Sequence, residues 1–198
     1  MKNPVVKYIL VIVVTALILF GLSTALAGVA EKNAQAVELA TMQALLPGST
    51  VFAEEAYTGG DANIRTVHKG STGFVIEVTT YGYAGEITML VGVDNDGTVT
   101  GLVVKDLSET FGLGREALTD VDFLKQFLNS SGTFAVATHG ADAFSGATGA
   151  ETAEGDTVDV DALTGATVTS KAIVRCVNAA VAYVTGADTE SAATSWGG

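Results

Sequence analysis

Four hydroxyl side chains stand close together in one short segment, Asp161-Ala-Leu-Thr-Gly-Ala-Thr-Val-Thr-Ser170. They are Thr164, Thr167, Thr169 and Ser170. An apolar run that predicts a helix follows, and the N–H groups at a helix N-terminus favour an anion. Gly165 and Ala166 are small enough for a phosphate to approach the backbone. Hydroxyl residues before a helix also serve as ordinary caps, so the residue types leave both interpretations open.

A near copy of this segment, Asp142-Ala-Phe-Ser-Gly-Ala-Thr148, lies earlier in the chain. Glycine, alanine and an acidic stretch follow it, so no helix N-terminus is predicted there to favour an anion. We interpret its surroundings, residues 138–156, as a polar loop of small residues. Thr148 is the formal equivalent of Thr167, and a special role for Thr167 alone or for both threonines stays open.

The elements that must position these residues begin with an uncharged N-terminal segment. No charged residue lies between Lys7 and Glu31, and this length is enough to cross a membrane as a helix. Lys2 and Lys7 precede the span, so residues 1–30 are expected to form a cytoplasmic stub and a transmembrane helix. A cleaved signal peptide, with Ala25-Leu-Ala27 as its cleavage site, is the alternative.

The remaining chain predicts an α+β domain over residues 31–186, followed by a flexible tail, 187–198. A helix over 31–46 ends at Pro47-Gly48, and apolar, β-branched runs at 74–83 and 86–106 predict antiparallel strands around the turn Asp94-Asn-Asp-Gly97. A glycine-containing loop then leads into an amphipathic helix with Phe123 and Phe127 on its apolar side. The last helix, from Ser170, stops at Gly186.

Charge and cysteine content exclude several classes of function. All 22 acidic residues and eight of the ten basic ones follow residue 30, a balance that repels nucleic acid. Cys176 is the only cysteine, so the chain has no internal disulfide or multi-cysteine metal site, and we expect this thiol to be buried in the last helix. His68 and His139 have no neighbours at metal-ligand spacing. We predict no metal site and no catalytic residue.

The segment 161–170 resembles the flavinylation pattern D-x-x-[ST]-G-A-T of the FMN-binding domain family. This family includes the G subunit of Rnf-type electron transport complexes and the C subunit of the sodium-pumping NADH:quinone reductase. The resemblance implies FMN bound to Thr167 through a phosphoester that a separate flavin transferase installs. It also implies a recognition and cofactor-binding set around that threonine: Asp161, Thr164, Gly165, Ala166, Thr169 and Ser170.

Two further segments resemble motifs of the same family. Ser108-Glu-Thr-Phe-Gly-Leu-Gly114 is similar to S/T-E-T-P-G-L-G, with Phe111 where proline is usual. Tyr81-Gly-Tyr-Ala-Gly-Glu-Ile87 is similar to G-Y-G-G-P-I, with departures at Ala84 and Glu86. The resemblance implies that the first of these loops lies beside the flavin, through Glu109, Thr110, Gly112, Leu113 and Gly114.

The resemblance implies an antiparallel-sheet FMN-binding domain with packing helices, outside the cytoplasm and anchored in the cell membrane. Such a chain would be an electron-carrier subunit of a membrane-bound ferredoxin:NAD+ oxidoreductase, coupled to Na+ or H+ translocation and partnered by the other subunits. The C subunit of the quinone reductase and a stand-alone extracytoplasmic flavin carrier are alternatives within the family. A membrane-anchored scaffold without redox function is the alternative from another class.

Overall fold

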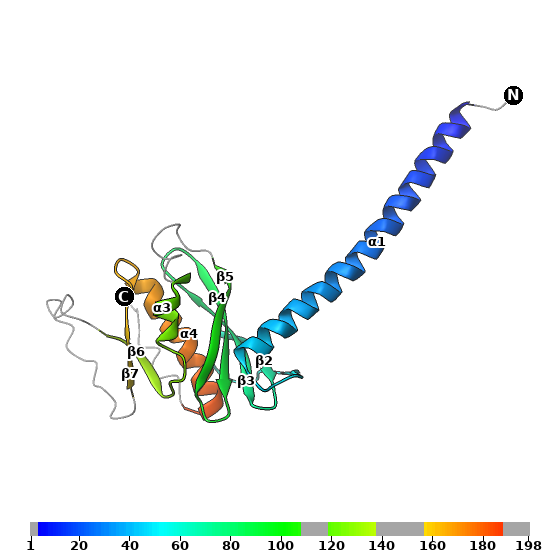
Figure 1. Cartoon of the computed structure of the whole chain (residues 1–198). Helices are drawn as coiled ribbons and strands as arrows, with labels where there is room; N and C mark the ends of the chain where they lie inside the picture. Colours follow the sequence, from blue (N-terminus) through cyan, green and yellow to red (C-terminus); the bar gives the residue numbers. More distant parts are fainter. Residues whose placement is uncertain (1–3, 108–118, 138–156, 188–198) are drawn as a thin grey trace. The chain divides into compact units, whose positions relative to one another are not determined.

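The computed structural model describes residues 4–107, 119–137 and 157–187, and the chain divides into two units, residues 1–41 and 42–198 (Figure 1). The first unit is a single helix, the greater part of α1, Pro4–Leu45. Its sequence is rich in alanine and leucine, which are strong helix formers. The second unit contains every strand of the described chain and two further helices. The predicted helix over 31–46 is confirmed.

The predicted transmembrane helix is not supported. Among the residues that the structure describes, no helix combines the length and the apolar character needed to cross a bilayer. The side chains at positions 4–12, 14, 18 and 22–26, which make up much of the predicted apolar run, lie outside those described.

A five-stranded antiparallel sheet forms the centre of the second unit. Its strands follow one another in chain order: β1 Ala53–Glu55, β2 Ile64–Lys69, β3 Gly73–Tyr81, β4 Glu86–Asp94 and β5 Val99–Leu107. The predicted turn between β4 and β5 is confirmed. Asp94 Oδ1 accepts hydrogen bonds from the backbone N–H groups of Asp96 and Thr98, at 3.0 and 2.7 Å, and Gly97 has a φ of 84°.

The C-terminal half adds α3 Val121–Lys125, β6 Thr133–Ala137, β7 Thr157–Asp161 and α4 Thr167–Thr185. β6 and β7 pair in parallel, and β7 was not predicted. The predicted amphipathic helix is shorter than expected, because Asp120 caps its start and Asn129, with a φ of 57°, lies in the turn that follows it. The predicted end of the last helix at Gly186 is confirmed.

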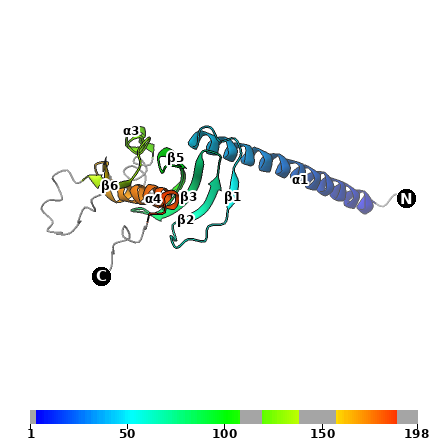
Figure 2. The ribbon, with the colours of Figure 1, turned by 90° about the horizontal axis from the view of Figure 1, so that it is seen from below.

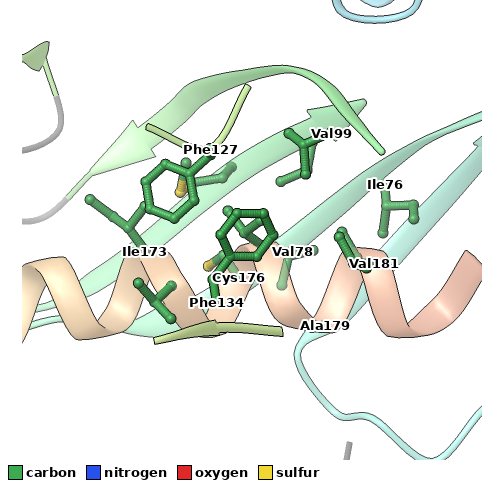
Figure 3. Packing of buried hydrophobic residues seen from close by; sticks show 14 of the residues in the cluster. Ile76, Val78, Val99, Phe127, Phe134, Ile173, Cys176, Ala179 and Val181 are labelled. Atoms are coloured by element: carbon green, nitrogen blue, oxygen red, sulfur yellow. The ribbon is translucent and has the colours of Figure 1, made fainter. Parts of the chain in front are cut away.

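α4 lies along one face of the sheet and buries an apolar stripe there (Figures 1 and 2). Phe127 and Phe134 pack between the sheet and this helix, with ring centroids 5.4 Å apart (Figure 3). Cys176 is fully buried in this core, as predicted. On the opposite face of the sheet, Leu45 and Leu46 pack with Val75. The assembly is the predicted mixture of helices and an antiparallel sheet.

Candidate functional site

The hydroxyl-rich segment forms a tight turn between the end of β7 and the start of α4. Thr164 and Gly165 are at the tip of this turn, and both are exposed. Gly165 has a φ of 80°, in the left-handed region that favours glycine over residues with a Cβ. The N–H of Ala166 donates to the carbonyl of Leu163 at 3.0 Å and closes the turn. The backbone then enters α4 at Thr167.

Ser170 stabilises this turn through hydrogen bonds of its side chain. Its Oγ is buried, donates to the carbonyl of Ala166 at 3.0 Å and accepts from the N–H of Leu163 at 3.3 Å. This hydroxyl therefore links the first turn of α4 to Leu163 and to Ala166, the residues on either side of the bend at Thr164 and Gly165. A buried hydroxyl with both bonds made is expected to stabilise the local fold.

Thr167 is the first residue of α4 and is exposed, whereas the preceding Ala166 is buried. Ala166 is the N-cap residue, and no side chain forms a capping hydrogen bond there. The N–H groups of the first helical turn have no partner within a helix, and together with the dipole they favour an anion. The plain helix-cap interpretation of the threonines is therefore wrong for this turn.

Thr169 differs from its neighbours because its hydroxyl is buried without a hydrogen bond. The residue is 1% exposed, and its Oγ1 has no hydrogen-bond partner. Leaving a buried polar atom unpaired costs about 1–3 kcal/mol, and such atoms are uncommon in folded proteins. A group able to pair with this oxygen would relieve that cost.

The turn is tied to the rest of the domain by polar contacts that the sequence did not reveal. Gln126, just after α3, makes two hydrogen bonds to the backbone of Asp161, the last residue of β7. Asn178 of α4 makes a similar pair with the backbone of Phe134 in β6, at 2.8 and 2.9 Å. The Asp161 end of the turn and the middle of α4 are thus held to neighbouring elements. No local pattern marks such long-range contacts.

A cleft of 790 Å³ lies beside the C-terminal part of α4, against the segment 56–64 that joins β1 to β2. Tyr57 and Tyr183 line it, with ring centroids 5.9 Å apart. Burial, followed by the neighbouring carboxylate of Glu55, raises the pKa of the Tyr183 phenol. Arg175 also lines the cleft. The volume is in the range of small-molecule sites.

The structure brings six of the predicted cofactor-binding residues into one turn with Thr167: Asp161, Thr164, Gly165, Ala166, Thr169 and Ser170. The other predicted positions, in the 108–114 loop and at Thr148, lie outside the described residues. They are Glu109, Thr110, Gly112, Leu113 and Gly114, with Thr148. Within residues 4–107, 119–137 and 157–187, no cluster of three or more histidine, cysteine or acidic side chains could hold a metal ion.

The turn lies inside a region that the chain shares with a known protein family. The profile of the FMN-binding domain family matches residues 82–182, a range that begins just after β3 and includes most of α4. The chain is 35% identical over 112 residues to the G subunit of the proton-translocating ferredoxin:NAD(+) oxidoreductase complex of Clostridium ljungdahlii. That alignment covers 57% of this chain and 53% of the relative.

Two further relatives carry related names. The G subunit of the Na(+)-translocating ferredoxin:NAD(+) oxidoreductase complex of Acetobacterium woodii is 34% identical over 110 residues, or 52% of this chain and 44% of the relative. The G subunit of the ion-translocating oxidoreductase complex of Escherichia coli is 38% identical over 104 residues, or 52% and 45%. The chain thus spans about half the length of the curated relatives it matches.

Proposed function

The chain belongs to the FMN-binding domain family, and from this premise we propose that it is an electron carrier with FMN bound covalently to Thr167. The observation that carries the proposal is the exposed Thr167 hydroxyl at an uncapped helix N-terminus inside the matched region. An exposed hydroxyl is accessible to a modifying enzyme. The N–H groups beside it suit the charge of a phosphoester.

The residues of the turn fit a phosphate group. Gly165 has no Cβ and leaves the backbone open on the exposed side of the turn. Thr169 supplies a buried hydroxyl without a partner, and Ser170 is already fully used in holding the bend. We assign Thr167 as the acceptor, Thr169 as an available hydrogen-bond donor, and Ser170 as the residue that shapes the turn.

Attachment requires an activated phosphate donor, and a flavin dinucleotide satisfies this requirement. Thr167 Oγ1 would be the nucleophile that forms the new O–P bond to the FMN half, while the pyrophosphate bond of the donor would break and the nucleoside monophosphate would leave. The hydroxyl proton would pass to a base of the flavin transferase. FMN, once bound, accepts and donates electrons singly or in pairs, and the protein holds it in place and tunes its potential.

We further propose that the chain works as a subunit of an ion-translocating ferredoxin:NAD+ oxidoreductase. The relatives named above are G subunits of such complexes, and two of their names specify protons and sodium ions respectively. Reaction with NAD+ and passage of the ion then belong to other subunits. Fractionation of cells, with detection of this chain beside the other subunits in a purified complex, tests this assignment.

A complex that translocates ions works in a membrane, so we propose a membrane location with the flavin domain on the extracytoplasmic side. The orientation follows from the position of Lys2 and Lys7 before the uncharged segment. Protease treatment of intact and of opened cells tests it. Degradation of the domain only in opened cells would place it in the cytoplasm and contradict the proposed orientation.

The decisive experiment is intact-mass analysis with peptide mapping of the denatured full chain, co-expressed with a flavin transferase. We expect an FMN adduct that survives denaturation, maps to the peptide containing Thr167 and disappears in Thr167→Val. Thr148→Val is the matched control and is expected to keep the adduct. Loss of the adduct in Thr148→Val alone would move the acceptor to the duplicate segment. A wild-type chain without adduct would overturn the proposal.

A further inference from the structure

The lysine and arginine side chains of the second unit divide into paired and unpaired groups. Four of them face a carboxylate within 4.0 Å: Arg65 with Glu86, Lys69 with Glu55, Lys105 with Glu77 and Lys125 with Asp122. Within residues 42–107, 119–137 and 157–187, Lys171 and Arg175 are the two without such a partner.

Both unpaired cations lie on the same face of α4 as Thr167. The three residues are spaced by four positions and are all exposed, whereas Thr169, Ser170 and residues 172–174 are buried. Side chains four apart on a helix are neighbours, and each step of four residues advances the helix by about 6 Å. Lys171 therefore follows Thr167 directly, and Arg175 lies about 12 Å along the axis.

Arg175 is held in place from the sheet side. Its Nη2 donates to the backbone carbonyl of Tyr81, at the end of β3, at 2.9 Å. The Tyr81 and Tyr83 side chains are 72% and 75% exposed, an unusual setting for two large aromatic residues. Arg175 also lines the cleft beside the C-terminal part of α4. The guanidinium thus lies where helix, sheet end and cleft meet.

We infer that Lys171 and Arg175 are positioning residues for the FMN tethered at Thr167. Lys171 pairs with the negative charge of the phosphodiester, and Arg175 receives the isoalloxazine ring farther along α4. The inference rests on the proposed function and adds to it the residues that orient the cofactor. An extended ribityl chain and ring span a length comparable to two turns of this helix.

The two side chains are expected to act differently. A lysine beside the phosphodiester restrains the tether, so its loss frees the whole cofactor. An arginine beside the ring favours negative charge on the reduced flavin, so its loss makes reduction less favourable. The guanidinium of Arg175 has five N–H donors. One of them bonds to the Tyr81 carbonyl, so the others remain available to the ring.

The test uses full-length chain loaded with FMN by co-expression with the transferase, in wild type, Lys171→Gln, Arg175→Gln and Arg175→Lys. Lys125→Gln is the matched control, since it removes the same charge from an exposed ion pair on α3. Intact mass first measures the loaded fraction. Flavin fluorescence anisotropy and the midpoint potential are then measured on the loaded protein at low and high salt.

We expect Lys171→Gln to lower the anisotropy, to a value that salt no longer changes. Arg175→Gln is expected to lower the equilibrium constant for flavin reduction roughly tenfold. This change lowers the midpoint potential by about 30 mV for a two-electron couple. Arg175→Lys should recover part of this shift. If the loaded wild type and both glutamine variants have the same anisotropy and the same midpoint potential, the inference is wrong but the proposed function stands. A wild type without adduct overturns the proposed function and the inference with it.

Discussion

Gln126 and Asp161 are joined by two hydrogen bonds. Gln126 Nε2 donates to the Asp161 carbonyl at 3.3 Å, and the Asp161 N–H donates to Gln126 Oε1 at 2.8 Å. The side-chain amide of Gln126 thereby makes the two hydrogen bonds that a neighbouring strand would make to the last residue of β7. Because the turn that carries Thr167 starts at this residue, the pair fixes where that turn leaves the domain.

We expect Gln126→Ala to lower the free energy of unfolding by about 1–2 kcal/mol, because two backbone groups lose their partner. Chemical denaturation measures the loss, and the loaded fraction after co-expression reports whether the turn is still presented correctly. Gln43→Ala is the control, since Gln43 makes a single hydrogen bond to the Thr50 carbonyl at 3.2 Å. Equal losses in the two variants would contradict a special role for the paired amide.

The hydroxyls of Ser170 and Thr169 predict opposite responses to removal. Ser170→Ala breaks two hydrogen bonds of a buried hydroxyl in the turn and is expected to cost about 1–3 kcal/mol of unfolding free energy. Thr169→Val keeps the shape and removes an oxygen that has no partner, so the flavin-free chain should be unchanged or more stable. Thermal unfolding of flavin-free protein compares them. A large loss in Thr169→Val would show that its hydroxyl is paired in solution.

Local patterns predicted the elements whose contacts are local. The hairpin between β4 and β5 follows from Asp94 and Gly97, whose side chain and φ suit that turn. The stop of α4 follows from Gly186, with a φ of 70°, and the burial of Cys176 follows from its place beside an apolar stripe. The turn from Asp161 to Ser170 was likewise found where the sequence placed it.

Contacts between distant parts of the chain were not predictable in the same way. β7 pairs in parallel with β6, from which residues 138–156 separate it in sequence, and its five residues, TVDVD, give a polar–apolar alternation too short to stand out beside the polar loop before it. Gln126 and Asn178 bind backbone groups 35 and 44 positions away, and an amide side chain has no periodic signature. These are the contacts that position the turn, so the sequence indicated the turn but not its supports.

Gly92 in β4 is expected to tolerate no side chain. A Cβ at this position would overlap the backbone carbonyl of Leu45, which packs over the sheet and accepts a hydrogen bond from Thr100 Oγ1 at 2.5 Å. Gly92→Ala should therefore lower the free energy of unfolding by about 3 kcal/mol, measured by chemical denaturation. Gly60→Ala is the control, because nothing lies within 4 Å of a Cβ there. A loss below about 1 kcal/mol in Gly92→Ala would show that residues 42–46 leave the sheet easily.

The Cys176 thiol makes stability depend on pH in the alkaline range. Burial raises its pKa to about 12; Arg175 opposes this shift and Asp61 adds to it. In the unfolded chain the thiol loses its proton near its ordinary pKa of about 8.5. Between these values the unfolded state binds fewer protons than the native state, so the free energy of unfolding falls as pH rises.

We therefore expect the wild-type unfolding free energy to fall more steeply than that of Cys176→Ala between about pH 9 and pH 11. The difference in slope approaches one proton, or about 1.4 kcal/mol per pH unit, because every other titrating group is common to both chains. Urea denaturation at closely spaced pH values measures both slopes. The cavity left by alanine shifts the whole curve without changing its slope, so parallel curves would contradict a protonated, buried thiol in the native state.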